Sequence, residues 1–137
     1  MKTRSISTVR VLSILLALAL TAGLAGCGST TQAKVLDEFM RHMAARDAAA
    51  AYALLSTLAK QEVPQETLNE AAQGQFGDLV QGYKSLTVGN IEVQTGADGT
   101  YADLSGSVNY EDGSSRNFTA RMDKEGDAWL VTNVNIE

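Results

Sequence analysis

The chain contains one cysteine, Cys27, and one histidine, His42, and these two side chains are the first candidates for chemistry. A thiolate is a nucleophile and a metal ligand, and a histidine can act as a general base near neutral pH. A single cysteine excludes a disulfide within the chain. Cys27 lies in the segment TAGLAGCGST, residues 21–30, directly after a short apolar run. This place in the chain predicts a role in processing and attachment rather than in catalysis.

The first 27 residues have the three parts of an export signal. MKTRSISTVR is basic, VLSILLALAL is an apolar run of ten residues, and TAGLAGC is an end made of small residues. A transmembrane helix needs about 20 apolar residues. The stretch from Val11 to Cys27 is shorter, and Thr21, Gly23 and Gly26 dilute it. The sequence therefore favours a cleaved signal peptide, residues 1–26, over a membrane anchor that stays attached.

The four residues Leu24-Ala25-Gly26-Cys27 resemble the lipobox of bacterial lipoproteins. The resemblance implies that the Cys27 thiol receives a diacylglyceryl group, that cleavage falls between Gly26 and Cys27, and that the new amine is acylated. Two or more acyl chains give stable anchoring where one does not. We therefore expect a lipid bilayer as a partner and the cell envelope, outside the cytoplasmic membrane, as the location. Gly28 in place of an aspartate favours the outer membrane in a cell with two membranes.

Charge is distributed unevenly along the chain. Three basic residues, Lys2, Arg4 and Arg10, precede Cys27, whereas all sixteen acidic residues follow it. Nucleic-acid binding requires clusters of Lys and Arg that contact phosphates. The acidic remainder has no such cluster, so we expect no nucleic-acid partner.

Residues 28–32 form a short polar tether, and a helical period begins at Ala33. Four apolar residues recur three, four and seven positions apart and define one helix face: Leu36, Phe39, Met40 and Met43. Asp47 is typical of an N-cap, and the tract AAAAYALLSTLAK that follows it predicts a second helix. That helix would carry three apolar residues on one side: Tyr52, Leu55 and Leu58. Pro64 fits the first turn of a third helix over QETLNEAA.

After Lys84 the period changes from helical to two, which indicates strands. The segment LTVGNIEVQT opens the sheet, and the short arms around Gly89-Asn90 favour a bulge over a hairpin turn. Turns at GADG, EDGS and KEGD separate three further strands. Alternation directs eight residues to one face: Ala102, Leu104, Gly106, Val108, Tyr110, Phe118, Ala120 and Met122. We therefore predict an α+β fold, with N-terminal helices on one face of a curved four-stranded antiparallel meander.

The segments VLDEFMRHMAARDAAAAYALLS and DGTYADLSGSVNYEDGSSRNFTARMDKEGDAWLV resemble the nuclear-transport-factor-2-like, or cystatin-like, superfamily. The likeness covers most of residues 33–137. It rests on the Arg46-Asp47 break between two helices and on a last strand that opens with Trp129 after an EGD turn. The resemblance implies a cone-shaped domain with a cavity. Members include isomerases, dehydratases, binding modules and domains without activity.

Enzymes of that superfamily commonly place an aspartate or tyrosine inside the cone, with a carboxylate or histidine beside it. Strand alternation puts Asp103 and Asp123 on the opposite face, unless a bulge inverts the register. His42 has no second histidine or cysteine as a partner once Cys27 is acylated. We therefore expect no metal, no cofactor and no catalytic residue, and interpret His42 as a half-exposed helix residue rather than as a general base.

Six side chains could line a cavity in the cone: Tyr52, Phe76, Tyr83, Tyr110, Met122 and Trp129. A small core needs the same residues, so both interpretations stay open. Arg116 and Arg121 could pair with an anionic ligand. Surface ion pairs with the nearby acidic residues are the simpler explanation.

The sequence thus predicts an envelope lipoprotein whose domain, residues 33–137, binds a small apolar ligand or an envelope protein without catalysis. The predicted boundaries are residues 1–26 for the signal peptide and residues 27–32 for the lipidated tether. Two alternatives remain. The first is a small enzyme of the isomerase or dehydratase type, and the second is a structural adaptor that acts through an exposed sheet face or edge.

Overall fold

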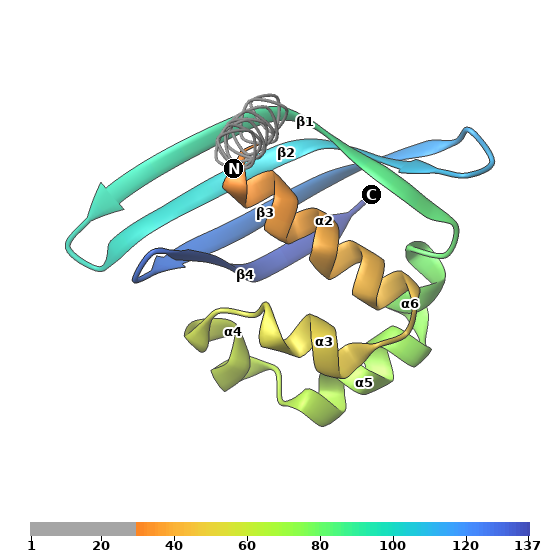
Figure 1. Cartoon of the computed structure of the whole chain (residues 1–137), viewed down its shortest axis with the longest axis horizontal. Coiled ribbons are helices and arrows are strands. Elements are labelled where there is room, and N and C mark those ends of the chain that lie inside the picture. Colours follow the sequence, from red (N-terminus) through yellow and green to blue (C-terminus); the bar gives the residue numbers. More distant parts are fainter. Residues whose placement is uncertain (1–29) are drawn as a thin grey trace, which may run out of the picture. The chain divides into compact units, whose positions relative to one another are not determined.

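The computed structural model describes residues 30–137, and residues 31–137 form one compact unit (Figure 1). The predicted signal peptide, its cleavage site at Gly26 and the lipid site at Cys27 lie outside the described residues. The helices are α2 (Thr31–Ala44), α3 (Ala48–Ala53), α4 (Thr57–Glu62), α5 (Gln65–Gln73) and α6 (Gln75–Leu79). The strands are β1 (Tyr83–Gly96), β2 (Gly99–Tyr110), β3 (Ser115–Glu125) and β4 (Ala128–Ile136). Helices followed by strands confirm the predicted α+β class.

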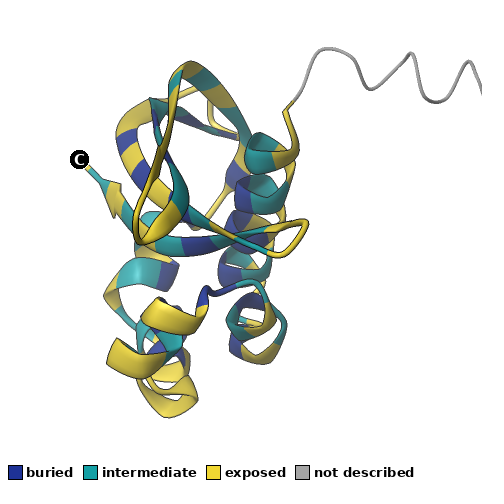
Figure 2. Cartoon of the chain, turned by 90° about the vertical axis from the view of Figure 1, so that its left-hand side faces the viewer, coloured by how far each residue is buried: buried dark blue, intermediate teal, exposed yellow. Residues whose placement is uncertain are grey.

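The four strands form one antiparallel sheet in the order β1-β2-β3-β4, as predicted. The sheet is curved and does not close on itself (Figure 2). The alternation predicted for β2 and β3 is confirmed, because seven of the eight residues assigned to the inner face are buried. Gly106 is partly exposed. One face of the sheet therefore belongs to the core and the other does not.

Helix α2 supplies the matching half of the core. Its apolar face is buried as predicted, with Leu36 and Met40 at 0% exposure, and it packs against β1 and β4. Asp37 fixes the helix to β1. It accepts a hydrogen bond from the Tyr83 hydroxyl at 2.5 Å and pairs with Arg41 at 2.9 Å. Burial raises the pKa of the Tyr83 hydroxyl well above its ordinary value, which keeps that donor protonated.

A bulge in β1 is confirmed at Gly89, where the register shifts between Val88 and Asn90. Gly106 lies opposite the bulge. A methyl group on Gly106 would lie 2.0 Å from the backbone oxygen of Thr87. The two backbones can therefore approach here only because Gly106 has no side chain.

The prediction of one continuous helix over residues 48–60 is wrong. Helix α3 ends at Ala53, and the next residues pair with β4 instead. The N–H of Val131 donates to the oxygen of Leu54 at 2.8 Å, and the N–H of Ser56 donates to the oxygen of Val131 at 2.8 Å. Pairing with a distant strand thus overrides local helix propensity. Leu58, which was expected on the apolar side, is 53% exposed.

We expect the Gly106→Ala variant to lose about 3 kcal/mol of unfolding free energy, because the new methyl group collides with the Thr87 carbonyl. Urea unfolding followed by circular dichroism measures the loss. Gly89→Ala is the matched control, since its methyl group would meet nothing closer than 3.7 Å. Equal stability of the two variants would contradict the close approach.

Candidate functional site

An apolar pocket of about 280 Å³ lies between the helices and β4. Most of its wall is aliphatic or aromatic. The lining residues are Phe39, Met43, Leu55, Ala59, Val63, Thr67, Leu68, Ala71, Phe76, Val131, Thr132, Asn133 and Val134. None of these side chains is ionisable. The pocket can therefore receive an apolar group, but its lining offers no acid, base or charge to a reaction.

The aromatic part of the wall is held by contacts between helices that the sequence separates widely. Phe39 of α2 and Phe76 of α6 pack edge to face, with ring centroids 6.4 Å apart. Arg46, two residues after the end of α2, donates to the oxygen of Ala72 at 2.8 Å and pairs with Asp78 at 3.0 Å. The predicted N-cap at Asp47 is confirmed, because its side chain accepts from the N–H of Ala50. These bonds hold α5 and α6 against the end of α2.

The polar edge of the pocket is a chain of hydroxyl groups. Ser56 is fully buried, accepts from the N–H of Ala59 at 3.2 Å, and lies 2.8 Å from the Thr132 hydroxyl. Thr132 donates to the Asp123 carboxylate. Since the proton of Thr132 points to Asp123, Ser56 must donate to Thr132. The chain fixes both hydroxyls in place, and Ser56 is no accessible nucleophile.

Helix α4 closes one side of the pocket, and Glu125 of β3 holds its first residue in place. The hydroxyl and the N–H of Thr57 donate to the Glu125 carboxylate at 2.5 and 2.8 Å. The hydroxyl bond, more than the backbone bond, holds the pKa of Glu125 below its ordinary value. The carboxylate also lies at the first turn of α4, where a negative charge is favourable.

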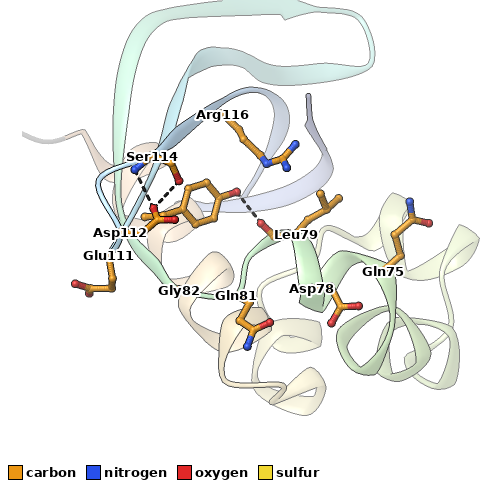
Figure 3. Close-up of a pocket in the computed structure, with 10 residues that line it drawn as sticks. Gln75, Asp78, Leu79, Gln81, Gly82, Glu111, Asp112, Ser114 and Arg116 are labelled. Carbon is orange, nitrogen blue, oxygen red and sulfur yellow. Dashed lines mark hydrogen bonds between the residues drawn. The ribbon is translucent and has the colours of Figure 1, made fainter.

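A second hollow, of about 490 Å³, lies where α6 meets the turn between β2 and β3 (Figure 3). Several of its polar groups already make hydrogen bonds within the protein. The Tyr110 hydroxyl donates to the oxygen of Leu79 at 2.6 Å, and burial raises the pKa of that hydroxyl. Asp112 accepts from the N–H and the hydroxyl of Ser114 at 2.9 and 2.5 Å. Arg116 makes no ion pair with any other described residue. Glu111 and Asp112 line the same hollow, and their negative charges disfavour an anion there.

The six predicted lining residues occupy different environments. Phe76 lines the apolar pocket and Tyr110 lines the polar hollow. Tyr83 and Met122 are core residues, whereas Trp129 is half-buried on β4. Tyr52 is also half-buried and lies under the ammonium group of Lys60, 5.1 Å from its ring centroid. The six do not share either pocket.

The two candidate acids and the histidine do not belong to the apolar pocket lining, although Asp123 bonds to the lining residue Thr132. Asp103 binds Arg121 through two hydrogen bonds of 2.8 and 3.0 Å on the outer face of the sheet. Asp123 is occupied by Thr132, and His42 is half-buried on α2. Among residues 30–137, no group of three or more His, Cys, Asp or Glu side chains could hold a metal ion. No helix in that range is long and apolar enough to cross a membrane.

Most of the pocket wall was missed in the sequence. Ala71, Val63 and Val134 look like ordinary periodic apolar residues, and nothing local marks them as lining a pocket. Ser56 did carry a signal, because a serine before a short helical stretch is typical of an N-cap. That signal was hidden inside a tract with strong helix propensity.

We expect Glu125→Gln to lower the unfolding free energy by about 1 kcal/mol or less at pH 7, since it weakens the cap of α4. Because the pKa of Glu125 is lowered in the folded protein, its ionised carboxylate stabilises the fold at pH values above the ordinary pKa of 4.5. This stabilisation is lost as the pH falls through the pKa of the folded state. The gap between wild type and variant should therefore close below pH 4.5. Urea unfolding at pH 7 and near pH 3 tests this, with Glu70→Gln as a control on an exposed helix position. A gap that is unchanged at low pH would rule out the carboxylate as its source.

Comparison with known proteins gives no family assignment. No protein-family model matches the chain, and no curated protein matches it. A protein from Sphaerobacter thermophilus is similar at 15% identity over 73% of this chain and 88% of its own, with a TM-score of 0.37. The protein Aln2 from a Streptomyces species is similar at 15% identity over 72% of this chain and 81% of its own, with a TM-score of 0.44. Similarity at this level carries no information about chemistry.

Proposed function

We propose that this protein is an envelope lipoprotein whose domain, residues 33–137, binds a small apolar ligand without catalysis. The observation that carries the proposal is the apolar pocket beside β4, with no ionisable side chain in its lining. Ligand pockets are typically concave, apolar and supplied with a few polar groups that orient the ligand. The polar residues in this lining are Thr67, Thr132 and Asn133, and of the two hydroxyls that of Thr67 is the one that the bonds described above do not engage.

The volume of the pocket limits the size of the ligand. A dry cavity of about 150 Å³ holds benzene, and this pocket has about 280 Å³. One or two fused rings, or a short branched chain, would therefore fill it. Each buried methylene contributes about 0.8 kcal/mol to binding before the costs of association.

The alternative of an isomerase or dehydratase has less support. Those reactions need an ionisable group in a dry cavity with a displaced pKa. The carboxylate tied to the pocket edge is Asp123, and the Thr132 hydroxyl already donates to it. No other observation favours a reaction at this pocket.

We also propose that the domain belongs to the nuclear-transport-factor-2-like superfamily. Support comes from the helix pair divided at Arg46-Asp47 and from the curved four-stranded meander. The position of Trp129 directly after the last turn supports the same assignment. The cone-shaped cavity that this resemblance implies would lie between helices and sheet, which is where the apolar pocket lies.

The proposed location rests on the sequence from Leu24 to Cys27. Acylation of Cys27 would attach the mature chain to a bilayer, and residues 27–32 would serve as its tether. Outward transfer by the signal peptide would place the domain outside the cytoplasmic membrane.

The ligand proposal predicts saturable binding of the neutral fluorescent probe 1-naphthylamine, which has two fused rings, to residues 28–137. This segment includes the whole compact unit and its core. Ala71→Phe should weaken the binding at least tenfold, because its ring would fill the pocket that Ala71 lines. Ala49→Phe places the same ring on an exposed helix position and should leave binding unchanged. Equal affinity in both variants would remove the pocket as the site.

The location proposal predicts that Cys27→Ser abolishes acylation, because a hydroxyl cannot form the thioether. The variant should appear as an unprocessed precursor or in the soluble fraction. Membrane fractionation and gel mobility of the full chain measure both outcomes. A variant that fractionates and migrates like wild type contradicts the lipoprotein assignment.

A further inference from the structure

The outer face of the sheet carries an array of neutral polar side chains. Residues opposite one another on paired strands point to the same face, so the register fixes its membership. The polar array consists of Ser85, Thr87, Asn90, Gln94, Ser105, Ser107, Asn109, Ser115, Asn117, Thr119, Asn133 and Asn135. The array extends over all four strands, on the face opposite the core.

Asparagine is the unusual component of this array. Five of the six asparagines of the chain lie at these outward strand positions, and four of the five are exposed. Asparagine is depleted in strands because it fits a pleated surface poorly. Strand stability therefore does not explain its concentration here, and a recognition role would.

The face is also hollowed. A depression of about 730 Å³ lies over its middle, lined by Asn90, Ser105, Thr119 and Asn133. Leu58 and Glu62 of α4 form its side wall, and Leu58 is 53% exposed. The depression thus combines amides and hydroxyls with one apolar edge.

Most charged side chains on this face have partners, and Glu92, which lines the depression, accepts a hydrogen bond of 3.4 Å from the Asn90 amide. Arg121 binds both oxygens of Asp103, and its guanidinium lies 4.4 Å from the ring centroid of Tyr101. Asp123 and Glu125 accept bonds from threonine hydroxyls. A polyanion would find no free cation in this depression, since the one arginine that lines it is paired.

We propose that this face binds a neutral glycan chain. Hydroxyl and carboxamide groups each offer a donor and an acceptor, as sugar hydroxyl and acetamido groups do. The side chains stand on a rigid sheet, with strands about 4.8 Å apart, so they form a regular array that suits a repeating polymer. Preorganised groups lose little entropy on binding. Val63, Thr132 and Asn133 line both this depression and the apolar pocket, whereas Asn90, Ser105 and Thr119 line the depression alone. The proposed glycan site goes beyond the function proposed above.

The test titrates residues 28–137, labelled with nitrogen-15, with hexamers of N-acetylglucosamine and of glucose. We expect saturable shifts with at least one hexamer at the amides of Asn90, Ser105 and Thr119, which line the depression and not the apolar pocket. The double variant Ser105→Ala/Thr119→Val removes two facing hydroxyls of the depression and should weaken binding at least tenfold. The double variant Thr95→Val/Thr100→Val removes a facing hydroxyl pair from the opposite side of the sheet and should bind like wild type. Thermal unfolding checks that both variants keep the fold.

Several results would overturn the glycan proposal. These are no saturable shift with either hexamer, shifts confined to the apolar pocket, or equal affinity of the two double variants. Concentration-dependent shifts at the array without glycan would identify a second copy of the chain as its occupant. Tighter binding of dextran sulfate than of either neutral hexamer would point to a polyanion instead.

Discussion

Two backbone hydrogen bonds, which join Val131 of β4 to Leu54 and Ser56, determine how the helices meet the sheet. Without them the apolar tract after Asp47 would continue as one helix, which its composition favours. With them the chain runs beside β4 for a few residues and then starts α4 with Ser56 as the N-cap. The pairing covers part of an edge strand, which reduces the risk of pairing with another chain. It also turns α4 away from the line of α3, so that α4 and α5 enclose a pocket beside β4 rather than packing flat against it.

The two faces of the sheet differ in polarity because side chains alternate between the faces along each strand. Ala102, Leu104 and Val108 face the core, whereas Asp103, Ser105 and Ser107 carry a carboxylate and two hydroxyl groups to the other side. The bulge at Gly89 preserves this division along β1. One extra residue between Val88 and Asn90 changes the register, and the strand on both sides of the bulge still presents apolar residues inward. A bulge without the bare backbone of Gly106 opposite it would not fit, so the division depends on that glycine.

Local signals predicted much of this fold from the sequence. The apolar face of α2, the cap at Asp47, the three turns and the bulge each depend on a few neighbouring residues, and all are present. The break before Ser56 was not predictable in the same way, because its cause lies at Val131, far along the chain. The pocket was unpredictable for the same reason, because it depends on residues that are far apart in the sequence. Its wall combines residues from four helices and one strand, so no single segment carries its signature. The six aromatic and thioether candidates were chosen by type, and side-chain type does not determine which cavity a residue reaches.

The distribution of acidic residues bears on what the outer face can bind. The chain has sixteen acidic residues, and most of them lie on helices, in turns or at the C-terminal end. Four stand at outward strand positions, Glu92, Asp103, Asp123 and Glu125, and they accept hydrogen bonds from Asn90, Arg121, Thr132 and Thr57, in that order. A neutral ligand that covers a paired carboxylate pays less desolvation energy than one that covers a free carboxylate, because the paired group has already lost part of its hydration. The long-range acidity of the domain disfavours polyanions, whereas an uncharged hydroxyl-rich ligand has no such barrier to overcome. A strongly acidic protein can therefore present a face suited to neutral ligands, provided that the carboxylates on that face have partners of their own.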